Sequence, residues 1–153
     1  MTPFHGLQLA IEMAERQRDV LAQAFAQAQR DVGMGQQQLE QLHSYAQDTE
    51  ARWSRENMVL SAELIRHHYQ FVDRLRHAMG MQEGVIANLQ RQEGNARAAL
   101  IQAETRVAGL KKVLEKRKLL LVATEQRREQ GRMDEMAALV YARRMANAQL
   151  EES

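Results

Sequence analysis

The sequence predicts an all-α fold, in which two long helices form an antiparallel coiled-coil hairpin and the second, longer helix carries an unpaired C-terminal extension. Apolar residues return at alternating three- and four-residue steps through residues 61–149, which is the coiled-coil pattern. A second pattern of the same kind runs through residues 3–55. Pro3 is the only proline, so neither pattern is interrupted by a residue that lacks a backbone N–H.

The first helix is expected over about residues 3–55. Thr2 can cap its first turn, and Pro3 suits the first helical position because its missing N–H is not needed there. Its apolar ladder, in which Arg18, Gly35 and Thr49 are the weak rungs, comprises Leu7, Ile11, Ala14, Leu21, Phe25, Ala28, Val32, Leu39, Leu42, Ala46 and Trp53.

A turn is expected at about residues 56–61, where the apolar pattern loses its phase. Asn57 can adopt the left-handed conformation that ends helices, Ser61 can cap the next helix, and Glu63 is favourable in its first turn. A short break between two ladders predicts an α-hairpin. With the tip near residue 58, the numbers of facing residues are expected to add up to about 116.

The second helix is expected over about residues 62–149, on the order of 130 Å at about 1.5 Å per residue. Its ladder comprises Ile65, Val72, Leu75, Met79, Ile86, Leu89, Ala96, Leu100, Ala103, Val107, Leu110, Leu114 and Leu121. The predicted register brings Gly33 and Gly35 to the level of Gly80 and Gly84, which predicts a hinge or a closely packed waist. The whole chain, 1–153, is interpreted as a single elongated coiled-coil domain.

The predicted register leaves the end of the second helix without a partner, because the first helix reaches only to about residue 113. Between residues 105 and 145 there are eleven basic and five acidic side chains, a net charge of +6. The run 119–122 (LLLV) adds more apolar surface than one seam needs. A basic helix with apolar surface and no partner favours binding to another protein.

No residue pattern predicts catalysis, a cofactor or a metal. The chain has no cysteine, which excludes disulfides and thiolate sites. His68 is expected in the seam, facing Thr49, because the histidines lack the spacing that presents two imidazoles on one helical face. No secretory signal and no transmembrane segment is expected. The net charge of +1 gives no general attraction to nucleic acid.

One group of residues widens the apolar face of the second helix near the hairpin tip. Leu64, Phe71, Ala78 and Val85 recur every seven residues beside the seam. Phe71, Leu75, Ala78 and Gln82 form a continuous line on one face of the helix. These residues either broaden the seam against the first helix or present a surface for a partner, and the pattern alone favours neither.

Three segments carry a resemblance to a known family. Residues 38–45 (QLEQLHSY), 68–75 (HYQFVDRL) and 129–135 (EQGRMDE) resemble the FliJ family of the bacterial flagellar type III export apparatus. The length and the two-helix plan also fit, and the resemblance covers nearly the whole chain. The stalk proteins of injectisomes are its close competitors.

The resemblance implies a non-enzymatic component of flagellar protein export. FliJ-like proteins form an antiparallel coiled coil similar to the central stalk of rotary ATPases. They associate with the hexameric export ATPase and regulate it, contact the cytoplasmic domain of the membrane-embedded export gate protein, and handle export chaperones. The resemblance places the gate contact on Phe71, Leu75 and Ala78, with Gln82 where a relative has histidine. These four residues are called the gate strip.

A second contact, with the ATPase ring, is assigned to residues of the extension. These are Lys116, Arg117, Arg127, Arg128, Met133, Asp134 and Glu135. The expected location is the cytoplasm, at the inner face of the membrane through the export apparatus, and the isolated chain is expected to be a monomer. The alternatives are an injectisome stalk, a generic structural or homodimeric coiled coil, and a binder of nucleic acid or anionic surfaces through residues 106–144.

Overall fold

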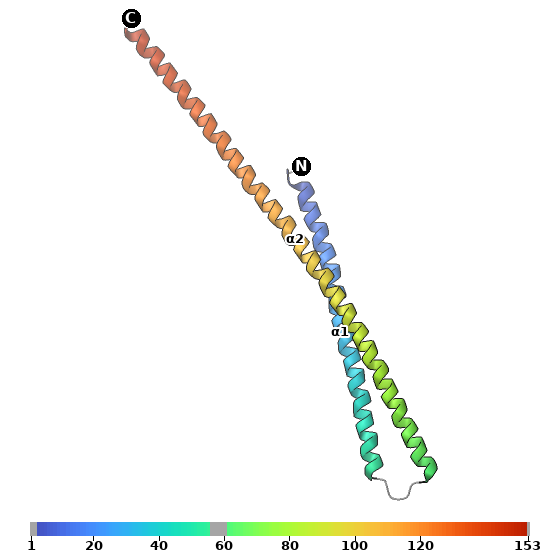
Figure 1. Ribbon diagram of the computed structural model, residues 1–153. Coiled ribbons are helices and arrows are strands. Elements are labelled where there is room, and N and C mark those ends of the chain that lie inside the picture. The colour runs from blue at the N-terminus through green and yellow to red at the C-terminus, as the bar shows by residue number, and fades with distance from the viewer. Residues whose placement is uncertain (1–2, 56–60, 153) are drawn as a thin grey trace. The chain divides into compact units, whose positions relative to one another are not determined.

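Two helices account for nearly all residues of the computed structural model, which describes residues 3–55 and 61–152 (Figure 1). Helix α1 spans His5–Arg55 and helix α2 spans Ala62–Glu152. The described residues contain no strand. The predicted all-α class, with a longer second helix, is therefore confirmed. The expected helix bounds were about 3–55 and 62–149, and the expected caps at Thr2 and Asn57 lie outside the described residues.

Ser61 caps the start of α2. The backbone N–H of Leu64 donates to the Ser61 hydroxyl oxygen at 3.3 Å, and that of Ile65 donates to the Ser61 carbonyl oxygen at 3.2 Å. The side chain thus satisfies an N–H group that the first helical turn leaves without a partner. Glu63 lies in the same turn, where a negative charge suits the helix dipole. The role predicted for Ser61 is confirmed.

Internal contacts divide the chain into two compact units, Met13–Arg106 and Met1–Glu12 with Val107–Ser153. The single domain expected over 1–153 stays a prediction.

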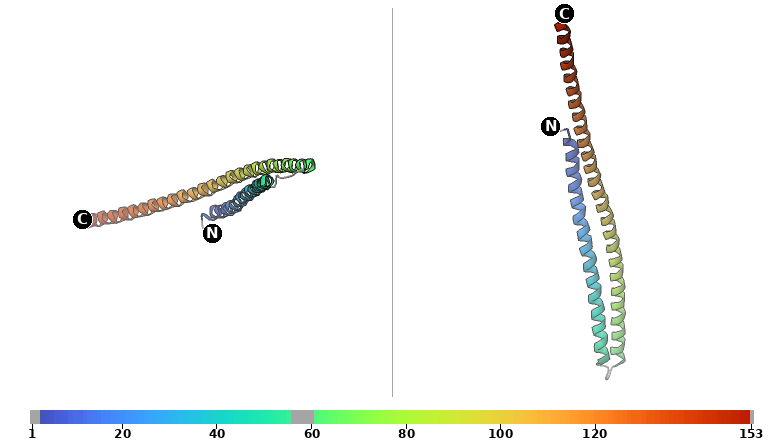
Figure 2. Two further views of the ribbon diagram at one scale, coloured as in Figure 1. Left: turned by 90° about the horizontal axis from the view of Figure 1, so that it is seen from below. Right: turned by 90° about the vertical axis from the view of Figure 1, so that its left-hand side faces the viewer.

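In the unit Met13–Arg106, α1 and α2 run antiparallel (Figure 2). The numbers of contacting residues add up to nearly one value, which only opposite directions produce. The sums are 116 for Tyr45 with Phe71, 117 for Gly35 with Gln82, 121 for Trp53 with His68, and 122 for Phe25 with Arg97. Two pairs match the predicted value of about 116, and two exceed it by five or six residues.

The seam of this unit consists of the two predicted ladders. Every rung of α1 from Ala14 to Trp53 is buried or half-buried, and so is every rung of α2 from His68 to Ala103. Ile65, the predicted first rung of α2, precedes this range and is exposed, at 39 %. His68 stacks on Trp53, with ring centroids 3.8 Å apart and planes 3° from parallel, and does not face Thr49 as expected. Among the described residues, this aromatic pair is the last packed layer of the seam toward the hairpin end.

Gly35 is a closely packed position of the seam. A Cβ atom added there would lie 3.2 Å from Leu89 Cδ1 and 3.3 Å from Ile86 Cγ1. At Gly33, Gly80 and Gly84 it would meet no atom within 4 Å. Gly35 contacts Gln82, which lies between Gly80 and Gly84, so the predicted level is confirmed, but of these four glycines only Gly35 is closely packed.

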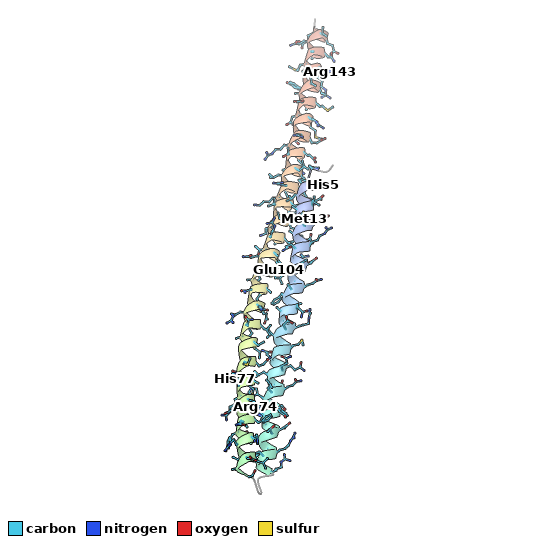
Figure 3. All side chains as sticks on the ribbon, turned by 90° about the vertical axis from the view of Figure 1, so that its right-hand side faces the viewer. His5, Met13, Arg74, His77, Glu104 and Arg143 are labelled. Carbon is cyan, nitrogen blue, oxygen red and sulfur yellow. The ribbon has the colours of Figure 1, made fainter. Side chains whose placement is uncertain are left out.

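In the unit formed by residues 1–12 and 107–153, the start of α1 covers only the first turns of the α2 segment. Ile11 and Val107 are buried, and Leu114 is the last half-buried residue. Every residue from 115 to 152 is exposed, and these residues are the C-terminal extension. Figure 3 shows side chains pointing outward around this part of α2, which carries Arg143. The predicted extension is confirmed.

Candidate functional site

The gate strip lies along the seam of the unit Met13–Arg106. Leu75 is buried, with 9 % of its surface exposed, and Phe71, Ala78 and Gln82 are half-buried. The ring of Phe71 meets Tyr45 of α1 edge to face, with centroids 5.9 Å apart and planes at 80°. Packing against α1 therefore accounts for much of the strip, as the broad-seam interpretation expects. A partner could reach the exposed parts of Phe71 and Ala78 but little of Leu75.

Gln82 is held by two hydrogen bonds across the seam. Its Nε2 donates to the carbonyl oxygen of Gly35 at 2.9 Å and to Oε1 of Gln38 at 3.1 Å. Because both amide hydrogens have acceptors on α1, the side chain links the two helices at the level of Gly35. Sequence analysis placed Gln82 on the strip with Phe71, Leu75 and Ala78, but nothing in the ladder predicted Gln38 as its partner.

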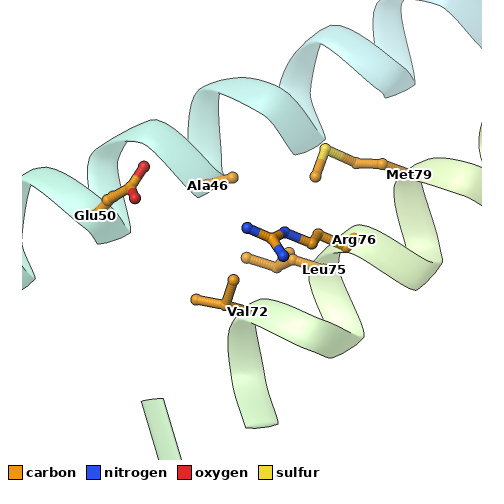
Figure 4. A pocket seen from close by; sticks show the side chains of 6 residues that line it. All are labelled: Ala46, Glu50, Val72, Leu75, Arg76 and Met79. Atoms are coloured by element: carbon orange, nitrogen blue, oxygen red, sulfur yellow. The ribbon is translucent and has the colours of Figure 1, made fainter. Parts of the chain in front are cut away.

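A recess opens between the helices beside the strip (Figure 4). It has a volume of about 170 Å³ and is lined by Ala46, Glu50, Val72, Leu75, Arg76 and Met79. Four of these side chains are apolar and belong to the seam. The recess forms where the small side chain of Ala46 faces the larger residues of α2, so that one rung of α1 fills less space than its neighbours.

Two charged side chains border this recess from opposite helices. Glu50 comes from α1 and Arg76 from α2, and both are exposed. Figure 4 shows Arg76 extending from α2 toward α1. Sequence analysis missed both residues, because Glu50 and Arg76 come to border one recess only through the register between the helices.

The residues assigned to the ATPase ring are all exposed on the extension, but they do not share one face. At about 3.6 residues per turn, steps of 7 and 11 residues return to nearly the same side. Lys116, Arg127 and Asp134 therefore lie on one side of α2, and Arg117, Arg128 and Glu135 on another. Met133 lies on a third side. A single partner surface could touch only part of this set.

The extension also exposes large apolar side chains that sequence analysis did not single out. Met136 is 67 % exposed, and Val140 and Tyr141 are exposed beside it. Met136 and Val140 share one heptad frame with Leu119, Val122 and Met133, and the two positions of that frame between Val122 and Met133 are the polar residues Gln126 and Glu129. We call the five apolar residues of this frame the extension stripe. Their spacing was the signal that could have found them.

No metal or membrane site stands out. Within residues 3–55 and 61–152, no group of three or more His, Asp or Glu side chains is arranged to hold a metal ion. In the same residues, neither helix has a stretch sufficiently apolar to cross a bilayer. The expected lack of catalytic, cofactor and metal residues stays a prediction.

Comparison with known proteins gives one match. No curated protein and no solved structure is significantly similar to the chain. A sequence model of the family described as "Flagellar FliJ protein" matches residues 4–146, which is nearly the whole chain. The antiparallel helices and the family match together show that this chain belongs to the FliJ family, whose members are components of flagellar protein export.

Proposed function

We propose that this protein is a non-enzymatic, stalk-like coupler of the flagellar export apparatus, which regulates the hexameric export ATPase and contacts the membrane export gate. The extension binds the ATPase ring, and the unit Met13–Arg106 binds the cytoplasmic domain of the gate protein and receives export chaperones. The protein thus works at the cytoplasmic face of the membrane, held there by its partners.

The observation that carries this proposal is the contrast between the two parts of α2. Residues 68–114 on the ladder are covered by α1, whereas all residues of the extension are exposed. The extension stripe is apolar, and a helix that exposes such a stripe without a partner is only marginally stable in water. A ring that encloses the extension would cover this surface on several sides at once, which suits the three faces on which the assigned residues lie.

Turnover of the export ATPase tests the extension. Full-length protein is expected to stimulate ATP hydrolysis, and a chain lacking residues 116–153 is expected not to. In the full chain, Met133→Gln with Val140→Gln is expected to reduce stimulation, because both side chains belong to the extension stripe.

The matched control is Met13→Gln with Val20→Gln. These residues have the same types, the same spacing and similar exposure, but they lie on α1. Equal stimulation by both double variants and the wild type would contradict the assignment of the extension to the ATPase.

A further inference from the structure

The charged side chains along residues 109–131 of α2 are not spread evenly around the helix. At about 3.6 residues per turn, this segment divides lengthwise into two halves of different charge. One half, here called the basic face, carries five basic residues and no acidic one, namely Lys112, Lys116, Arg117, Arg127 and Arg128. The other half carries two basic and three acidic residues, namely Lys111, Lys118, Glu115, Glu125 and Glu129. The positive charge of this segment therefore belongs to one side of the helix.

The basic face is open to solvent along its whole length. Its five basic side chains are exposed, and within residues 61–152 none of them forms an ion pair or a side-chain hydrogen bond. Val113 and Leu120 lie between them, with 40 % and 66 % of their surface exposed. Asp134 and Glu135 follow on the same side, so the basic face ends at Gly131. The result is a row of cations around two exposed apolar side chains.

A bilayer that contains anionic lipids matches this face in charge and in polarity. The face is on the order of 30 Å long, and a membrane offers negative charge over all of that length. Lysine and arginine can bury their aliphatic stems while their charged ends stay among the head groups. Val113 and Leu120 would then reach the boundary between head groups and acyl chains.

Nucleic acid matches the same face less well. Phosphates would pair with the basic side chains, but they would leave Val113 and Leu120 without an apolar contact. Residues 109–131 also contain no aromatic side chain on which an unpaired base could stack. The two apolar residues at the centre of the face therefore favour lipid.

We propose that the basic face binds the surface of an anionic lipid bilayer, with residues 109–131 lying parallel to the membrane plane. The basic residues supply most of the affinity, and Leu120 adds apolar contact. All of the basic residues except Lys112 are also expected to contact the ATPase ring, so lipid and ring compete for them. Lipid binding itself is a property of the chain alone and does not depend on the ring.

Flotation of the full-length chain with lipid vesicles tests the inference. The chain is expected to bind vesicles of equal parts phosphatidylglycerol and phosphatidylcholine, and not to bind vesicles of phosphatidylcholine alone. Lys112→Gln with Lys116→Gln is expected to weaken binding about tenfold or more, because each basic residue near an anionic surface changes the affinity about fivefold.

The matched control is Lys111→Gln with Lys118→Gln. This pair removes the same two charges from the other half of the same helix segment. Because salt screens charges that are about 10 Å or more from the surface, the control is expected to leave the affinity within about threefold.

A second pair of variants tests the apolar part of the contact. Leu120→Gln is expected to weaken vesicle binding about fivefold, since a leucine that enters the bilayer boundary loses exposed apolar surface. Leu119→Gln is its control, because Leu119 is 62 % exposed but lies about 100° further around the helix. Leu119→Gln is expected to leave the affinity within about twofold, and circular dichroism verifies that both variants keep their helicity.

The outcomes separate this inference from the proposed function. Equal binding to neutral vesicles, equal losses for the two lysine pairs, or no binding to anionic vesicles would overturn the inference. Binding to duplex DNA in place of vesicles, weakened by the Lys112 and Lys116 changes but not by Leu120→Gln, would overturn it in favour of nucleic acid. Vesicle binding as expected, by a chain that does not stimulate the ATPase, would contradict the proposed function and support this inference.

Discussion

At the scale of single residues, position relative to the seam decides what a glycine does. Gly35 is a rung of the α1 ladder, and its missing side chain is what lets Leu89 and Ile86 approach. Gly80 and Gly84 are off the ladder and exposed. The position of each glycine around its helix, which can be read from the sequence, therefore predicts whether the glycine is packed. The level of the glycine along the hairpin does not, because Gly35, Gly80 and Gly84 lie at about the same level.

This difference predicts opposite responses to alanine. Gly80→Ala and Gly84→Ala are expected to raise the free energy of unfolding by about 1 kcal/mol each, since alanine has the higher helix propensity and its Cβ meets open space. Gly35→Ala is expected to gain less or to destabilise, because its Cβ crowds two seam side chains. Urea denaturation measures all three. An equal gain at the three positions would contradict the packing described for Gly35.

Gln82 is expected to stabilise the helix pair through its bonds to Gly35 and Gln38. Gln82→Ala is predicted to lower the free energy of unfolding by about 1 kcal/mol, a usual net value for such hydrogen bonds. Gln90→Ala, an exposed glutamine of the same helix, is the control and should change stability little. If both variants unfold alike, the cross-seam bonds do not contribute measurably.

The role of Gln82 also affects how its place in the gate strip is tested. A gate partner that hydrogen-bonded Gln82 would have to compete with Gly35 and Gln38. Likewise, Leu75→Ala would leave a gap in the seam and cost on the order of 2 kcal/mol or more. Phe71→Ala is the cleaner probe of gate contact, because part of its ring is exposed.

At the scale of the helices, periodicity predicted the phase of each helix correctly and its contacts only partly. The ladder residues are those that became buried, and Ser61 caps α2 as its side chain and position suggested. Periodicity fixes which side of a helix is apolar. It does not fix how far each side chain reaches, and so it missed the stacking of Trp53 on His68.

The candidate site was less predictable for the same reason. The gate strip was inferred from one helix, where spacing alone defines a face. The recess needs Ala46 of α1 opposite Val72 and Met79 of α2, and a small error in register would move it. The extension stripe was readable in principle, but its frame differs from that of the seam, which hides it from a search in a single phase.

The extension is expected to be the least stable helical element. Its residues lack the buried apolar contacts that hold the rest of α2, and isolated helices are marginal in water. Amides within residues 115–152 are predicted to exchange with solvent faster than those of residues 72–110, and to slow when the export ATPase is added. Equal protection of both segments in the chain alone would contradict this account.

At the scale of the whole molecule, the chain is predicted to be a monomer when isolated. α1 already covers the seam of α2 in the unit Met13–Arg106, so that seam is not available to a second copy. Light scattering after size exclusion should give a mass near 17.6 kDa. A stable species of twice that mass would favour the alternative of a homodimeric coiled coil, paired through the extension stripe.

The central claim is that one chain binds the ATPase and the gate at the same time through separate surfaces. The most direct measurement is size-exclusion chromatography of the chain mixed with the export ATPase and the cytoplasmic gate domain. The account predicts that all three elute together, that Met133→Gln with Val140→Gln weakens only the retention of the ATPase, and that Phe71→Ala weakens only the retention of the gate domain. Displacement of the gate domain by the ATPase, or the loss of both partners from either variant, would contradict it.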